Sequence, residues 1–557
     1  MRFNDLKICL KTAVLLTAVL LLGAGRVVAQ QQVNLTAGPT TVTLPDGSVV
    51  PMWGYSCGTA VTGSTATCAN LNPLAPAATT TTPAGWSPVI ITVPTGQTLV
   101  INLSNNLSFT AGTATNTVPT SLVIVGQLGG GLGDVTQRTT TTPPDHSKAQ
   151  PLTWPIAGDA PGAGLTGVGV PPTQGPRVQS FSTEVAAGAT TSLTWTTPRP
   201  GTYLLESGTH PSIQGPMGLY GMVVVTEAPS ATAVAPASVT TGCAYTPVAG
   251  TTCVVPYNAE ANLLFSEIDP VQNNAVQAAV TTAGFSETMV WSGQPGGCGN
   301  PSSTTYHQCY PPAVNYTPLY YLINGVGFSR SNASASLFPV TPATGVTGSV
   351  LVRVVNAGLR MHVPSIVGSQ TGTAVAPALP PSGFALIAED GNPLPGIPRV
   401  QSEVFMAAGK TYDVMINAPA AAATAATLPV YDRELSLSGN ATARDAGMLA
   451  YISVNGGTLP SSPSIAAAVA RADTYNSLIA GQKFTVLDSG KRVIANDPNV
   501  YGIHLLAPAA NGTVTLNANG TFTYVPNSGS TATSDSFTYC ANGSVTAGVC
   551  SSGFGCG

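Results

Sequence analysis

Residues 201–225 read GTYLLESGTHPSIQGPMGLYGMVVV, and this stretch decides the fold class. Two runs rich in aromatic, leucine and valine residues, 201–205 and 220–226, flank a segment of Gly, Pro and Ser. This pattern predicts two β-strands joined by a loop. The same signal recurs upstream, at residues 190–196 and at 88–103, where two β-branched runs surround Pro-Thr-Gly. The first half of the chain is therefore expected to form sheets.

The second half continues the pattern, with one helical exception. Strands are predicted at 350–355, 384–388, 402–406, 411–416 and 448–454. Residues 270–283, PVQNNAVQAAVTTA, predict a helix. Beyond residue 483, alternating runs around Asn-Gly and Asn-Ala-Asn-Gly predict hairpins of a small separate sandwich. The sequence as a whole predicts an all-β protein.

Composition supports this interpretation and excludes some functions. Charged residues make up 8% of the chain, and the formal net charge is −4. Sheet surfaces can be solvated by Thr and Ser, whereas helices usually carry Glu, Lys and Arg on their exposed faces. A chain with so few basic residues lacks the positive face that nucleic acid requires. It also lacks a polybasic patch for anionic membranes.

The N-terminus predicts a secretory signal. Arg2, Lys7 and Lys11 precede an apolar run at 12–22, and Val27-Val28-Ala29 offers small residues for cleavage. We expect residues 1–29 to be removed and the protein to be secreted, extracellular or held at the cell surface. No later segment reaches eighteen uninterrupted apolar residues, so no transmembrane helix is predicted.

The cysteines agree with an oxidising compartment. Eight of them fall into close pairs that we expect to form disulfides, because their short spacing suits staples across hairpins or loops rather than metal sites. The pairs are Cys57 with Cys68, Cys243 with Cys253, Cys298 with Cys309, and Cys540 with Cys550. Cys556 is left over near the end and is a candidate for contact between chains.

Several segments occur in the order of motifs in the multicopper oxidases and resemble them. In the first half these are GQTLVINLSN at 96–105, TSLVIVGQ at 120–127, and 201–225, which resembles GTxWYHSHxxxQxxxGLxGxLxV. In the second half they are LLFSEIDP at 263–270, PLYYLINGVGF at 318–328, VLVRVVNAGLRMHVPSIVG at 350–368, FALIAEDGNPLPG at 384–396 and AAGKTYDVMINAP at 407–419. The resemblance spans residues 33–457 and has no counterpart to the family's third domain.

The resemblance implies a domain organisation. It implies two cupredoxin-like Greek-key sandwiches, followed by a small sandwich that resembles Ig-like or cadherin-like repeats. We expect a signal peptide at 1–29, the first sandwich at 30–227, a linker at 228–255 and the second sandwich at 256–457. A second linker is expected at 458–480, and the C-terminal domain at 481–557, where the sequence stops abruptly and a truncated domain is expected. Each linker is rich in small residues and Pro, Thr or Ser.

The resemblance stops at the copper ligands. In that family, copper is held by His-x-His pairs, whose imidazoles converge on the metal. Where the first pair is expected, this chain has Val123 and Val125; where the second is expected, it has Glu206 and Gly208. Valine and glycine offer no ligand atom, so the chain resembles a degenerate member of the family.

Two hypotheses of different class follow. The first is a non-catalytic scaffold, binding or adhesion protein without a cofactor, whose partners the sequence does not identify and whose repeats favour surface contact or self-association. The alternative is a copper-dependent oxidase, acting on metal ions such as manganese or on phenols, with non-standard ligands or a missing third domain. Its candidate ligands are Glu206, His210, Met361 and His362.

Overall fold

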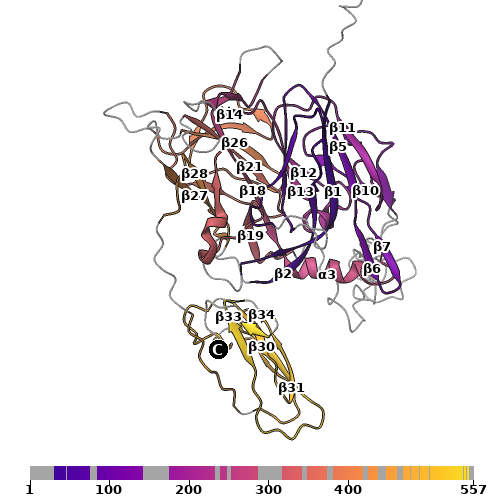
Figure 1. Ribbon diagram of the computed structural model, residues 1–557, viewed down its shortest axis with the longest axis vertical. Coiled ribbons are helices and arrows are strands. Elements are labelled where there is room, and N and C mark those ends of the chain that lie inside the picture. The colour runs from indigo at the N-terminus through magenta and orange to yellow at the C-terminus, as the bar shows by residue number, and fades with distance from the viewer. Residues whose placement is uncertain are drawn as a thin grey trace, which may run out of the picture.

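The computed structural model describes most of the chain beyond the first 29 residues. The described residues are 30–45, 47–75, 85–141, 175–231, 239–246, 253–285, 316–341, 348–372, 381–417, 425–436, 447–460, 468–476, 478–488, 490–500, 502–543, 545–546 and 548–550. The expected signal peptide, Cys298, Cys309 and Cys556 lie outside them. In Figure 1 the strands form two adjoining sandwiches and a third, smaller one.

The first sandwich consists of two mixed sheets. One has the order β11-β5-β1-β2, with bounds Thr190–Trp195, Thr98–Asn105, Gln30–Thr43 and Val49–Cys57. The other has the order β3-β4-β13-β12-β8, with bounds Thr67–Asn70, Val89–Val93, Tyr220–Val225, Gly201–Glu206 and Val123–Ile124. Strands distant in sequence are neighbours, and β1 with β5 and β4 with β13 pair in parallel. These connections between the two sheets are those of a Greek-key sandwich.

Two ribbons and a short helix complete this domain. The ribbons pair β6 with β7 and β9 with β10, bounded by Ser108–Ala111, Ala114–Thr117, Thr139–Thr141 and Arg177–Ser180. Helix α2 is the single turn Pro211–Gln214 in the loop between β12 and β13. The core between the sheets includes Trp53, Trp195, Tyr203 and Val223.

The second sandwich repeats this plan. Its larger sheet has the order β19-β18-β21-β26-β23-β24, with β25 also on β23; the bounds are Tyr320–Ile323, Ala259–Ile268, Ser349–Asn356, Thr411–Asn417, Phe384–Glu389, Asn392–Pro393 and Val400–Gln401. Its smaller sheet has the order β20-β28-β27-β22, with bounds Leu337–Pro339, Leu449–Val454, Ala426–Asp432 and Pro364–Ile366. A 3₁₀ segment, η2, covers Arg330–Ser336.

The two sandwiches share a hydrophobic layer, which we call the seam. Leu204, Met222 and Val224 from the first domain pack with Leu264 and Val355 from the second. Strands β12, β13, β18 and β21 are therefore buried on nearly every residue, because one face meets its own core and the other meets the seam. Strands covered on both faces lose the alternation of polar and apolar residues.

Helix α3, Pro270–Val280, crosses from the second domain to the first (Figure 1). The Asp269 carboxylate caps it by accepting from the Val271 and Gln272 amides, and Pro270 suits the first helical position. Val276 and Val280 pack into the core of the first sandwich. The predicted helix is thus present, and it ends three residues earlier than the predicted 283.

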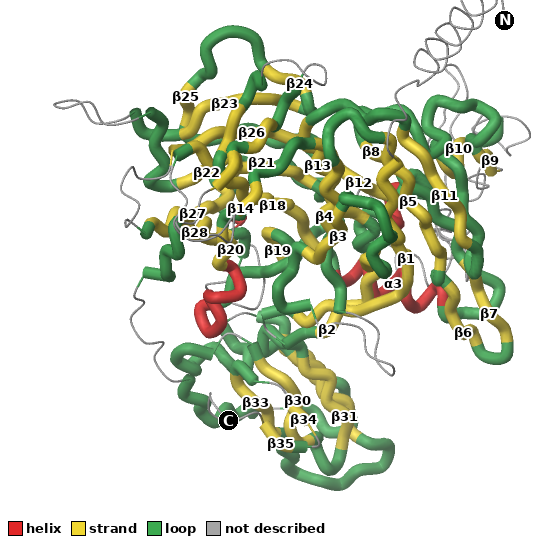
Figure 2. Tube along the Cα trace, turned by 45° about the horizontal axis from the view of Figure 1, so that its top comes forward, coloured by secondary structure: helices red, strands yellow, loops and turns green. Residues whose placement is uncertain are grey.

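The third sandwich is small and lies below the other two in Figure 2. Its His504 lies close to Gly47 of the first domain. Its strand sets are β29-β32-β31, β30-β33 and β34-β35, bounded by Phe484–Val486, Phe522–Pro526, Gly512–Leu516, Ile503–Ala507, Thr538–Ala541, Val545–Thr546 and Val549–Cys550. The predicted hairpin is present, since β31 and β32 pair across the Asn-Ala-Asn-Gly turn. Phe484 and Phe522 centre its core.

Three of the four predicted disulfides lie among the described residues and are formed. They join Cys57 to Cys68, Cys243 to Cys253, and Cys540 to Cys550. The segment around Cys243, expected as part of a linker, contains two small ribbons, β14 with β15 and β16 with β17, bounded by Ser230–Ala231, Val239–Thr240, Gly242–Cys243 and Pro256–Tyr257. Tyr245 and Tyr257 are buried against the second domain.

Two other expectations are corrected. Residues 402–406 were expected to form a strand, but they form only isolated antiparallel bridges, Glu403 with Ser365 and Met406 with His362, without a continuous ladder. The expected second linker, 458–480, includes Ala468 and Tyr475, which pack into the third core. Among the described residues, no helix is both long and apolar enough to cross a membrane.

Candidate functional site

The positions that correspond to copper ligands in the resemblance all lie around one end of β12. Glu206 ends that strand directly opposite Val123 of β8, so both side chains point to the seam rather than into the first core. Val125 also packs at the seam, beside its hydrophobic layer. The alternation that would aim two side chains at one point is thus retained, with valine at both positions.

The space beside Gly208 is filled. A Cβ added to Gly208 would lie 2.6 Å from Val123 Cγ2, 3.0 Å from Ser182 Oγ and 3.2 Å from Ser121 Oγ. The Thr209 hydroxyl donates to Ser121 Oγ at 2.9 Å. These close contacts leave no room for a side chain at position 208.

Next to Gly208, the side chains of Ser207, Thr120 and Gln214 form a group of hydrogen-bonded polar residues. Ser207 Oγ and Thr120 Oγ1 donate to the Gln214 amide oxygen at 2.6 and 2.8 Å. The Gln214 amide nitrogen donates to the Pro119 carbonyl at 2.8 Å. Buried polar groups are stable when they are satisfied in this way. Three of the four positions, with two valines and a glycine, therefore supply no ligand atom, and hydroxyl side chains occupy the space beside Gly208.

His210 does not join Glu206 in a metal-ligand cluster of three. It is buried, with a left-handed backbone at φ 38°, and its amide donates to the Gln179 carbonyl at 2.9 Å. Its own carbonyl accepts from the Ile213 and Gln214 amides at the start of α2. This histidine thus shapes the turn that leads into α2.

His362 lies elsewhere, fully buried in the second domain between two carboxylates. Its Nδ1 is 2.8 Å from Asp432 Oδ2, and its Nε2 is 3.1 Å from Glu267 Oε2. The carboxylates raise the pKa of His362 to about 9, against the opposing effect of burial. Both ring nitrogens therefore carry protons at neutral pH, and neither offers a lone pair to a metal.

The carboxylates of this triad are held as firmly as the imidazolium. Glu267 Oε1 accepts from the Leu359 and Arg360 amides at 2.6 and 2.8 Å. Asp432 accepts from the Val363 and Glu434 amides and from the Ser436 hydroxyl, and these bonds together with His362 hold its pKa below the usual range. We call Glu267, His362 and Asp432 the histidine triad.

The neighbours of the triad do not convert it into a metal site. Within the described ranges, His362, Asp432 and Glu434 are the one group whose potential ligand atoms lie within 4.8 Å of one another. Glu434 is exposed, and the other two are already hydrogen-bonded as described. Met361 is 39% exposed, whereas His362 is fully buried, so the two adjacent side chains do not share a site. The four candidate ligands of the copper alternative are not brought together.

A second buried charge cluster, which the sequence reasoning missed, centres on Arg353 of β21. Its Nε donates to Glu260 Oε2 at 3.0 Å, and its Nη1 lies 3.3 Å from Asp413 Oδ2. The guanidinium nitrogens Nη1 and Nη2 also donate hydrogen bonds to the hydroxyl oxygens of Thr202, Thr226 and Tyr257, at 3.0 to 3.3 Å. Arg353 is fully buried, and the flanking carboxylates raise its pKa further.

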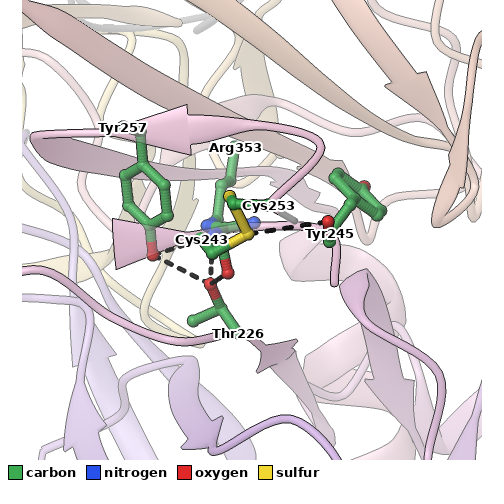
Figure 3. Close-up of a disulfide and its surroundings, with 6 residues drawn as sticks. All are labelled: Thr226, Cys243, Tyr245, Cys253, Tyr257 and Arg353. Atoms are coloured by element: carbon green, nitrogen blue, oxygen red, sulfur yellow. Dashed lines mark hydrogen bonds between the residues drawn. A yellow bond between two sulfur atoms is a disulfide. The ribbon is translucent and has the colours of Figure 1, made fainter. Parts of the chain in front are cut away.

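This cluster ties the two domains together. Thr202 donates to Asp413 Oδ1 at 2.6 Å, and the Thr411 hydroxyl donates to the Thr202 carbonyl at 2.9 Å. Tyr245, close to the disulfide of Cys243, donates to Asp413 Oδ2 at 2.5 Å. Figure 3 shows the disulfide, Tyr245, Tyr257 and Thr226 gathered around the guanidinium. The sequence signal was Arg353 itself, a single charge inside the apolar run VLVRVV.

A cavity of about 330 Å³ opens at the seam and is lined by residues of both large domains. Its walls include Leu204, Glu206 and Tyr220 of the first domain and Glu267, Tyr316 and Leu359 of the second. Burial raises the pKa of Glu206 to about 7. The Glu206 carboxylate forms no ion pair or hydrogen bond with any described residue, in contrast to the paired carboxylates nearby.

Comparison with known proteins identifies one part of the chain. Residues 464–549 match the family model of the bacterial Ig domain, so the C-terminal sandwich is Ig-like. This range begins within the expected linker, in agreement with the packing of Ala468 into the third core. No curated protein sequence matches the chain.

Solved structures give a similarity over most of the chain. The blue copper oxidase from Nitrosomonas europaea is 14% identical, with a TM-score of 0.39 over 76% of this chain and 85% of that one. The copper nitrite reductase from the same organism is 14% identical, with a TM-score of 0.41 over 76% and 94%. Fet3p, a multicopper oxidase that functions in iron import, is 12% identical, with a TM-score of 0.40 over 89% and 64%. The described residues form two large β-sandwiches and a C-terminal Ig-like domain, so the chain is of the all-β class.

Proposed function

We propose that this protein is a non-catalytic scaffold or binding protein of the cell surface or extracellular space, in which the two cupredoxin-like domains form one rigid block. One observation carries the proposal: the positions where the resemblance places copper ligands hold Val123, Val125, Glu206 and Gly208, and hydroxyl side chains fill the space beside Gly208. A fold by itself does not determine chemistry, which depends on the residues of the site.

The shared seam supports a scaffold role. Strands of both domains contribute to one hydrophobic layer, and the Arg353 cluster crosses it with hydrogen bonds to Thr202 and Thr226. A continuous packed layer with satisfied charges does not favour independent motion of its two halves. The Ig-like domain has a separate core and extends this block, as an adhesion module does.

The location at the cell surface or outside the cell is supported by the three disulfides and by the signal-like N-terminus. Disulfides persist in oxidising compartments and are rare in the cytosol. Fractionation of cells that express the whole chain, followed by thiol labelling, tests this. We expect protein at the surface or in the medium with paired cysteines; reduced protein confined to the cytosol would contradict the proposal.

Copper content tests the non-catalytic role. The whole protein is exposed to excess copper, desalted and measured by mass spectrometry, with His210→Ala as the matched variant. We expect fewer than about 0.1 copper ions per chain in both proteins, because the positions lack convergent imidazoles. One or more tightly held ions would overturn the proposal in favour of the copper oxidase alternative, and their loss in His210→Ala would assign the site.

A further inference from the structure

Glu206 is an ionisable side chain in an unusual setting. It ends β12 on the seam face and lines the 330 Å³ cavity, yet no described residue forms an ion pair or hydrogen bond with its carboxylate. By contrast, Glu267 and Asp413 at the same seam accept hydrogen bonds from His362 and Arg353. Glu206 is half-buried, and carboxylates largely withdrawn from water are normally paired. The arrangement leaves one acidic group directed at a space large enough for a ligand.

The other polar groups of the cavity are largely committed. Glu267 is held by the Leu359 and Arg360 amides and by His362. The Tyr316 hydroxyl donates to the Glu267 carbonyl at 3.2 Å. Among the described residues, the Ser212 hydroxyl has no hydrogen-bond partner, and both Ser212 and Tyr220 line the same cavity. The chemistry available to a ligand is therefore one carboxylate with two hydroxyls nearby.

The remaining wall is apolar and aromatic. Leu204, Pro211 and Leu359 line it together with Tyr220 and Tyr316. Burial raises the pKa of both tyrosines, so their rings stay neutral and do not compete as anions. Aromatic rings beside a carboxylate attract ammonium groups through their π-electrons and allow the methyl or methylene groups to leave water. Cavities that bind small molecules have volumes from about 300 Å³ upward.

We infer that this cavity binds a compact organic cation, a primary or quaternary ammonium compound, with the Glu206 carboxylate as its counter-ion. A neutral molecule of the same shape would leave Glu206 unpaired, and an anion would be repelled by it. The inference goes beyond the scaffold role proposed above and does not depend on the copper content, since occupancy of the cavity is measured directly.

Calorimetric titration of the whole protein tests the inference with choline and its neutral isostere 3,3-dimethylbutan-1-ol as probes. At pH 8 we expect choline to bind and the alcohol to bind at least about tenfold more weakly, the factor for one charge-assisted contact. Glu206→Gln keeps the size of the side chain and is expected to lower choline affinity by the same factor. Glu227→Gln, which removes an exposed carboxylate outside the cavity lining, is the matched control and leaves affinity unchanged.

The pH dependence gives a second readout that a purely steric change would not produce. With a pKa of about 7, Glu206 is mostly ionised at pH 8 and mostly neutral at pH 6. Choline affinity of the unmodified protein should therefore fall roughly five- to tenfold between those values, and that of Glu206→Gln should stay flat. Absence of choline binding at millimolar concentration would overturn the inference. Equal binding of choline and alcohol, or unchanged affinity in a folded Glu206→Gln protein, would overturn it too.

Discussion

Replacing Arg353 by methionine is the sharpest test of how the two domains are held together. Methionine fills much of the same volume but leaves Glu260 and Asp413 buried without their cation. Thr202 and Thr226 each lose a donor as well. Removing one partner of a buried ion pair costs about 3–5 kcal/mol, because the remaining charge has neither water nor a counter-ion.

The expected change is measurable by differential scanning calorimetry. For domains of this size, 1 kcal/mol corresponds to about 2–4 °C in Tm, so Arg353→Met should lower the Tm of the two-domain block by about 10 °C. A chain of several domains does not unfold in one step, so each transition is fitted separately. The Ig-like domain, whose core is separate, is the internal control and should melt unchanged.

A compensated variant separates charge from packing. Adding Glu260→Gln and Asp413→Asn to Arg353→Met removes the unpaired charges, and at least half of the lost stability should return, because neutral replacements of buried ion networks are often tolerated. A Tm change below about 2 °C for Arg353→Met would refute the reasoning. A compensated protein no more stable than the single variant would show that packing, rather than charge, dominates.

Three further perturbations have definite expected outcomes. The folded-state pKa of His362 is about 9, above its unfolded value of about 6.5. Protonation of the triad therefore stabilises the folded state by on the order of 3 kcal/mol below pH 6.5, and this contribution is lost as the pH rises to about 9. Urea midpoints should fall over this range, and a pH-independent midpoint from about pH 7 to about pH 10 would contradict the prediction. Gly358→Ala should destabilise at every pH and lower the Tm, because the new Cβ would lie 1.8 Å from Glu267 Oε2; an unchanged melting curve would count against the close packing. Joint replacement of Cys243 and Cys253 by serine should cost about 2–3 kcal/mol, seen as a lower urea midpoint, and an unaltered midpoint would rule out a stabilising staple.

Local structure was predictable from sequence where a local cause sets it. Asp269 followed by Pro270 fixes the start of α3, and the Asn-Ala-Asn-Gly turn fixes the register of β31 and β32. Close cysteine spacing predicted three disulfides that are present among the described residues. The 14-residue strand β1 was missed because its partners include β5, more than sixty residues away.

The site was less predictable, because its contacts join residues far apart in the chain. Thr202 lies 151 residues from Arg353, and Glu267 lies 95 from His362. Sequence alone predicted that the copper-ligand positions of the resemblance are replaced, and it named Glu206 and His362, but it did not predict the neighbours of either residue. A usable signal was present: Arg353, Glu267 and Asp413 are single charges inside apolar strands, and such charges are paired or functional when buried.

The distribution of charge along the seam gives Glu206 its significance. Where the resemblance places copper ligands, the chain has Val123, Val125, Glu206 and Gly208. The Arg353 cluster and the histidine triad also lie in the two large domains, and each of their carboxylates is paired with a cation. A scaffold without a ligand would be served as well at position 206 by leucine, which continues the run Leu204-Leu205. The unpaired carboxylate instead costs stability at neutral pH, since burial favours its protonated form. A costly group that lines a cavity is typical of binding sites, where function rather than folding explains the residue.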